Sequence, residues 1–160
     1  MISRFFTFIC LAFLLVSCSS NSNDIDLVPL DLMKYGAPFT IMAPDSIAVE
    51  EEDNLISKDL VIKYGKEYDV LVQIQDAMDA DFSRLRKNQE DLVSAGKYFS
   101  KIVQSDDKGF IFENKVDSTY INYGFRYMIL QNNKEYIFQS GLYGNYDLES
   151  VESMYQAVQQ

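Results

Sequence analysis

The stretch that decides the fold is FIFENKVDSTYINYGFRYMILQNNKEYIFQS, residues 110–140. Apolar and aromatic side chains alternate with polar ones along it, which is typical of antiparallel strands that bury one face. Turn-forming residues divide it into three strands, which we expect at 110–115, 119–131 and 134–140. The middle strand places apolar residues on one face: Ile121, Tyr123, Phe125, Tyr127 and Ile129. This line predicts the core face of an antiparallel meander.

An amphipathic helix is predicted directly before this meander, over residues 79–103. Apolar residues recur there at helical intervals and form one stripe: Phe82, Leu85, Leu92, Phe99 and Val103. Asp79 and Asp81 lie at its expected start, where exposed N–H groups and the helix dipole favour carboxylates. Gly96 lies inside the stripe, so we expect the helix either to approach the sheet closely or to bend there.

The remaining elements lie on either side of these two. Two hairpins are expected before the helix, over residues 39–49 and 60–74. A short helical turn that ends at Gly36 precedes them, and Asp147 is placed to cap a C-terminal helix. The sequence therefore predicts an α+β fold, with a mainly antiparallel sheet of about six to seven strands on which one long helix and a C-terminal helix pack.

The order of these elements, over about residues 37–158, resembles that of the PsbP-like α/β/α sandwich. In that fold a curved antiparallel sheet lies between helices, and the chain ends on a helix. The resemblance implies a binding or assembly role without catalysis, because most members of that fold are not enzymes. A cystatin-like fold or another roll with a helix on a sheet is the alternative.

The N-terminal residues are interpreted as an export signal that is not part of the fold. Arg4 precedes an apolar run at Phe5–Val16, which is too short to span about 30 Å of hydrocarbon as a helix. The run leads into Leu15-Val16-Ser17-Cys18, which resembles the lipobox of bacterial lipoprotein precursors. This resemblance implies cleavage before Cys18 and attachment of acyl chains, such as palmitate, to it. The alternative is a signal peptide that is cut elsewhere and releases a free secreted protein.

These features divide the chain into three parts: a signal peptide at 1–17, a lipidated cysteine with a flexible tether at 18–26, and a single α+β domain at 27–160. Membrane attachment is then expected through the lipid on Cys18. By the same resemblance, Ser19 stands where many lipoproteins retained in the inner membrane carry Asp, so the outer membrane is favoured. The choice between its periplasmic and surface leaflets stays open.

The composition excludes several chemistries. The chain carries 14 Lys and Arg residues against 24 Asp and Glu residues, a net charge of −10, which disfavours a nucleic-acid partner. It has no His, and with Cys10 in the signal and Cys18 lipidated the mature protein lacks a free thiol. We therefore expect no cofactor, no metal and no catalytic residue.

One candidate surface is the Gly- and Tyr-rich segment 141–147, which joins the meander to the C-terminal helix. Its tyrosines are amphipathic and have little rotamer entropy to lose, which favours contact with a protein or a glycan. The residues assigned to this possible binding surface are Tyr143, Tyr146, Tyr120 and Arg126. The alternative is a tight loop whose rings fold back on the core.

Three sets of acidic residues are weaker candidates. The run at 50–53 is interpreted as a solvated strand end rather than a cation site. A calcium site could use Asp76, Asp79 and Asp81, although helix capping accounts for two of them. Glu113 and Glu135, if they face each other on neighbouring strands, could serve acid–base catalysis.

The sequence therefore favours a lipid-anchored bacterial envelope protein that acts as a non-catalytic binding or accessory module. Its partner would be another envelope protein or a glycan. Two alternatives stay open: a hydrolase or glycan-active enzyme that depends on carboxylates, and a structural spacer without a specific ligand.

Overall fold

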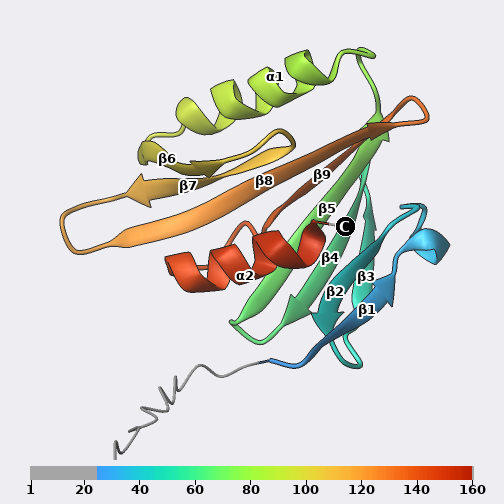
Figure 1. The fold of residues 1–160 in the computed structure, drawn as a ribbon, viewed down its shortest axis with the longest axis horizontal. Coiled ribbons are helices and arrows are strands. Elements are labelled where there is room, and N and C mark those ends of the chain that lie inside the picture. Colours follow the sequence, from blue (N-terminus) through green and yellow to red (C-terminus); the bar gives the residue numbers. More distant parts are fainter. Residues whose placement is uncertain (1–24, 160) are drawn as a thin grey trace, which may run out of the picture.

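The structure is a computed structural model that describes residues 25–159. Its elements in chain order are β1 (Leu27–Asp31), the 3-10 helix η1 (Met33–Tyr35), β2 (Thr40–Pro44), β3 (Val49–Asp53), β4 (Ser57–Tyr64), β5 (Tyr68–Asp76), α1 (Phe82–Ser94), β6 (Phe99–Ser105), β7 (Gly109–Lys115), β8 (Ile121–Gln131), β9 (Lys134–Ser140) and α2 (Leu148–Val158) (Figure 1). The predicted signal peptide and Cys18 lie outside the described residues.

The main sheet has seven strands in the order β3-β4-β5-β9-β8-β7-β6, and every neighbouring pair is antiparallel. A separate two-stranded sheet is formed by β1 and β2. With one helix in the middle of the chain and another at its end, the predicted α+β class is confirmed. Within residues 25–159 the helices are too short or too polar to cross a membrane.

The meander at 110–140 forms as expected from its alternation. β7 pairs with β8 and β8 with β9, and the turn between the last two places Asn132 and Asn133 at φ 53° and 59°. Asn tolerates this left-handed backbone better than most residues, which suits a tight hairpin. On the expected core face, Phe125 and Tyr127 are buried, whereas Ile121 at the strand's start is 39% exposed.

The two helices pack on opposite faces of the main sheet. The residues of β8 show this, because they contact α2 and α1 in alternation. Phe125 and Tyr127 pack against Tyr155 of α2, in a core that also includes Ala43 of the β1–β2 hairpin. Met128 instead lies in a second core with Leu85 and Val93 of α1. Figure 1 shows α2 across one face of the sheet and α1 along the part formed by β6, β7 and β8.

The expected helix over 79–103 is wrong in its second half. Asp81 caps α1 by accepting a hydrogen bond from the Ser83 N–H at 2.9 Å, but α1 ends at Ser94 and β6 follows. Bulges interrupt the pairing of β6 with β7 and bring Phe99 and Ile102 to the same core, although they are three residues apart. The predicted stripe included Val103 instead, and Val103 is 38% exposed on β6, so the four-residue interval from Phe99 to Val103 was not that of a helix.

The first expected hairpin is also wrong, whereas the second is confirmed. β2 pairs with β1 and β3 pairs with β4, so the chain passes from one sheet to the other between β2 and β3. Ser46 occupies the turn there with φ 61°. The turn after Pro44 was predicted correctly. The alternation of apolar and polar residues, however, does not show which neighbour a given strand will pair with. β4 and β5 pair around Gly65 as predicted, and η1 ends at Gly36.

The described chain begins close to the turn between β4 and β5. Leu27 pairs with Pro44, and the Tyr68 hydroxyl at the start of β5 donates to the Met42 carbonyl at 2.8 Å. In Figure 1 the chain enters β1 at this end of the sheet. The first residues of β1 and β5 therefore mark the end of the domain that lies nearest the predicted tether.

Candidate functional site

The loop between β9 and α2 contains two tyrosines with opposite environments. Tyr143 is 96% exposed, whereas Tyr146 is 4% exposed and belongs to the core beneath α2. Leu142, next to Tyr143, is 67% exposed. Only part of the expected surface is therefore presented to solvent: the Tyr146 ring folds back, as the alternative interpretation of this segment required.

Tyr146 fixes the loop through both its backbone and its side chain. Its carbonyl accepts from the Tyr123 N–H at 3.0 Å, and its N–H donates to Asn122 Oδ1 at 2.8 Å. Its hydroxyl donates to Asp69 Oδ2 at 2.8 Å, which in turn lies 3.0 Å from Lys63 Nζ. Burial, followed by the bond to Asp69, raises the pKa of Tyr146, so its hydroxyl stays protonated and donates.

The two glycines of the loop are required by this packing. A Cβ atom at Gly141 would lie 2.2 Å from the Asp69 carboxylate, and one at Gly144 would lie 1.7 Å from the Tyr146 ring. Both distances are far below van der Waals contact, so only glycine lets the chain pass here. The loop is thus a tightly fitted segment that holds Leu142 and Tyr143 outward.

A small cavity of about 130 Å³ lies beside this loop. Its lining comes from β7, β8, the end of β9 and the loop: Phe112, Asn114, Asn122, Tyr123, Gly124, Arg126, Ser140, Gly141, Leu142, Gly144 and Tyr146. We call it the Arg126 pocket, because Arg126 is the one charged residue in this lining. Asn114 and Asn122 lie opposite each other on β7 and β8 and add polar amides.

The guanidinium of Arg126 is largely withdrawn from water without a charged partner. Its Nη1 donates to the Phe125 carbonyl at 3.0 Å, and its Nε is buried with no hydrogen-bond partner. The group lies 5.8 Å from the centre of the Phe112 ring. Within residues 25–159 no carboxylate forms an ion pair with it. Burial lowers the pKa of Arg126 to about 10, so it remains a cation at neutral pH.

The structure brings together some of the residues assigned to the surface and separates others. Arg126 and Tyr146 line the same pocket, and Tyr143 lies in the loop beside it. Tyr120 is 44% exposed before β8 and is not part of that lining. Asn114 and Asn122 were missed, although their position on the same strand faces as Phe112 and Arg126 was readable from the alternation.

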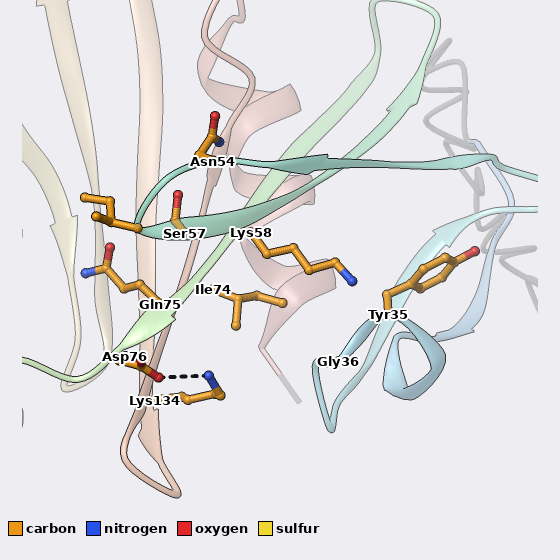
Figure 2. A pocket seen from close by; sticks show the side chains of 10 residues that line it. Tyr35, Gly36, Asn54, Ser57, Lys58, Ile74, Gln75, Asp76 and Lys134 are labelled. Atoms are coloured by element: carbon orange, nitrogen blue, oxygen red, sulfur yellow. Dashed lines mark hydrogen bonds and ion pairs between the residues drawn. The ribbon is translucent and has the colours of Figure 1, made fainter.

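A larger hollow of about 320 Å³ lies at the other end of β5, between the η1 turn and the ends of β4 and β5 (Figure 2). Lys58 and Lys134 line it, and Figure 2 shows the Lys134 amine directed at Asp76, 3.0 Å away. Lys58 forms an ion pair with Glu51. Because a carboxylate accompanies each lysine, this hollow lacks the uncompensated charge that distinguishes the Arg126 pocket.

The acidic residues considered as calcium ligands do not converge. Asp76 pairs with Lys134, Asp79 pairs with Arg84, and Asp81 caps α1. Among the residues that the structure describes, no cluster of three or more His, Cys, Asp or Glu side chains is arranged to hold a metal ion.

The two glutamates considered for acid–base catalysis are not on neighbouring strands. Glu113 is on β7 and Glu135 is on β9, and β8 lies between them. Glu113 accepts from the Tyr123 hydroxyl at 3.4 Å, while Glu135 accepts from Gln75 Nε2 at 2.6 Å. The expectation of neighbouring strands is wrong because a meander puts its middle strand between the outer two.

No protein-family model matches the sequence, and no curated protein matches it.

Proposed function

We propose that this protein is a lipid-anchored component of a bacterial envelope whose α+β domain is a non-catalytic binding module for another envelope component. The observation that carries the proposal is the Arg126 pocket beside the exposed pair Leu142 and Tyr143. An uncompensated cation next to exposed apolar side chains offers both kinds of contact that binding sites combine.

The way the loop is held supports a binding role. Tyr143 and Leu142 are exposed, but the backbone around them is fixed by the buried Tyr146 and its bond to Asp69. A side chain presented by a fixed loop loses little conformational entropy when it is bound. Tyr143 also has few rotatable bonds, so its contact area is available at low entropic cost.

The position of the loop also agrees with a partner near the same membrane. Asp69, which holds Tyr146, directly follows Tyr68, and Tyr68 bonds the β2 strand close to the first described residues. The loop therefore lies at the end of the domain from which the predicted tether departs. A tether of about eight flexible residues would have an end-to-end distance of roughly 15 Å.

Replacing Cys18 by alanine is expected to release the protein from membranes or to leave the precursor uncut. The reason is that acyl chains, at about 0.8 kcal/mol per buried methylene, would be its attachment, since an acidic surface is repelled by anionic lipids. Membrane fractionation and gel mobility would measure this. The matched control is Cys10→Ala, which alters the other cysteine and is expected to change neither. Unchanged fractionation and processing of Cys18→Ala would contradict lipidation.

Replacing both Leu142 and Tyr143 by alanine is expected to reduce capture of the partner by crosslinking in native membranes by about tenfold or more, as truncation of exposed anchor residues does. The matched control is Leu55→Ala, which removes a fully exposed leucine at the opposite end of β5. Capture that is equal in the double variant and in wild type would place the partner elsewhere. Absence of any captured partner in wild type would favour the spacer.

A further inference from the structure

Arg126 differs from the other arginines that the structure describes in having no carboxylate partner. Of the three arginines within residues 25–159, Arg84 and Arg86 form ion pairs with carboxylates, while Arg126, whose Nε is buried, forms none. Cations withdrawn from water are normally paired, because desolvation is expensive without a compensating anion. The missing partner of Arg126 is therefore best explained as a group that arrives from outside the domain.

The hydrogen-bonding state of the guanidinium indicates how such a group would be held. Nη1 is directed to the Phe125 carbonyl, and Nε has no partner. The edge formed by Nε and Nη2 is thus the one left for an external acceptor. Two oxygens of one planar anion match this edge, and a small turn of the guanidinium toward the cavity would satisfy the Nε–H.

The charge of the lining favours an anion with a single negative charge. Arg126 supplies one positive charge, and the other lining residues are neutral. A phosphate monoester carries about −1.5 to −2 at neutral pH, and it would enter a protein of net charge −10 with one cation to receive it. A carboxylate matches both the charge and the fork of the guanidinium.

We propose that the Arg126 pocket receives a carboxylate on a short neutral stem, such as the C-terminal carboxylate of a peptide; this rests on the proposed binding function. The cavity of about 130 Å³ is roughly four times the volume that one water molecule takes up in the liquid. That space holds the carboxylate and the first atoms of its stem. The rest of the ligand would lie outside, against Leu142 and Tyr143, while Asn114 meets polar atoms of the stem.

The test uses the full-length protein, purified from membranes in a nonionic detergent, and follows two NMR signals, the Arg126 Nε–H and the backbone N–H of Gly124, which also lines the pocket. N-acetylglycine is expected to shift both signals saturably. N-acetylglycinamide, which differs by lacking the charge, is expected to bind about 10- to 100-fold more weakly, because charge-assisted hydrogen bonds are lost. Equal binding of the amide, or a shift that never saturates, would overturn the proposal. Tighter binding of inorganic phosphate would overturn it in favour of a phosphate site.

Two variants separate a role in binding from a role in folding. Followed at the Gly124 N–H, which both variants keep, the titration is expected to be abolished in Arg126→Met. In Arg126→Lys it is expected to be about tenfold weaker, because lysine keeps the charge but loses the fork. Arg84→Met, which alters an exposed arginine, should leave it unchanged. Should Arg126→Met fail to fold, the wild-type titration with acid and amide still decides.

The same variants distinguish failure of this inference from failure of the proposed function. If N-acetylglycine does not bind but Leu142 and Tyr143 are still needed for crosslinking, the binding module stands and the carboxylate is wrong. If N-acetylglycine binds through Arg126 but crosslinking ignores the loop, the pocket stands and the proposed partner surface is wrong.

Discussion

Replacing Tyr146 by alanine is expected to lower the free energy of unfolding by about 3–5 kcal/mol, the range for removal of a large buried aromatic ring. The ring is 4% exposed, and its hydroxyl bonds Asp69 at 2.8 Å. Its loss would leave a cavity beneath the loop and would remove one partner from a buried carboxylate. Chemical denaturation followed by circular dichroism would measure the loss.

Two further variants show which part of the effect comes from the ring. Tyr146→Phe keeps the ring but removes the bond to Asp69, so a smaller loss of about 1–2 kcal/mol is expected. Tyr143→Ala removes an exposed ring three residues away and should change stability by no more than about 0.5 kcal/mol. Equal losses for Tyr143→Ala and Tyr146→Ala would contradict the difference in burial on which the candidate site depends.

The local parts of this fold were predictable because local patterns specify them. Apolar residues recur at every second position from Ile121 to Ile129, and turn-forming residues flank that run, so the three strands and the Asn132-Asn133 turn follow from the sequence. The caps Asp81 and Asp147 were predictable for the same reason, since each accepts a hydrogen bond from an N–H two or three residues ahead. These features depend on residues that are close together in the sequence, and a local sequence pattern can therefore predict them.

Pairings between distant segments were not predictable in this way. β5 lies beside β9, so that Val70 pairs with Ser140, and neither strand carries a pattern that names the other. β6 was predicted wrongly for a related reason. Its bulged pairing with β7 cannot be read from residues 99–105 alone, and the interval from Phe99 to Val103 matched a helix although both residues lie on a strand.

The candidate site shows the same limit at the scale of single residues. The sequence placed Tyr143 and Tyr146 together as a possible surface, but their exposure depends on Asp69, which lies far away in the chain. Arg126 was recognised as a possible member of the site. Its lack of an anionic partner depends on which carboxylates lie near it in the folded protein, and the sequence of β8 alone does not show which ones do.

Hydrogen bonds to a single carboxylate, that of Asp106, connect the C-terminal helix to the turn between β6 and β7. Asp106 is therefore a second position where a substitution is expected to have a large effect. In the turn between β6 and β7, Asp106 accepts from the Tyr155 hydroxyl at 2.7 Å and from Gln159 Nε2 at 2.8 Å, both at the end of α2. Its other oxygen accepts from the N–H groups of Lys108 and Gly109 at 2.8 and 2.9 Å. One side chain thus connects the turn to α2.

Replacing Asp106 by alanine is expected to lower the free energy of unfolding by about 2–3 kcal/mol, because the buried Tyr155 hydroxyl is left without an acceptor and the turn loses its bonds. Denaturant unfolding would measure this. The matched control is Asp107→Ala, which alters the neighbouring exposed carboxylate and should change little. A loss of similar size for both variants would mean that the connection to α2 contributes nothing of its own.

The same carboxylate gives stability a dependence on pH whose sign follows from its bonds. Burial raises the pKa of Asp106, but hydrogen bonds from Tyr155, Lys108, Gly109 and Gln159 lower it more, so it lies below the ordinary value of 3.8. The folded state therefore favours the carboxylate, and its contribution is complete above about pH 4 and is lost as the pH falls through the lowered pKa. Asp106→Asn removes this titration, so the stability gap between wild type and variant should narrow below pH 4. A constant gap from pH 6 to pH 2 would show that the charge of Asp106 does not hold α2 in place.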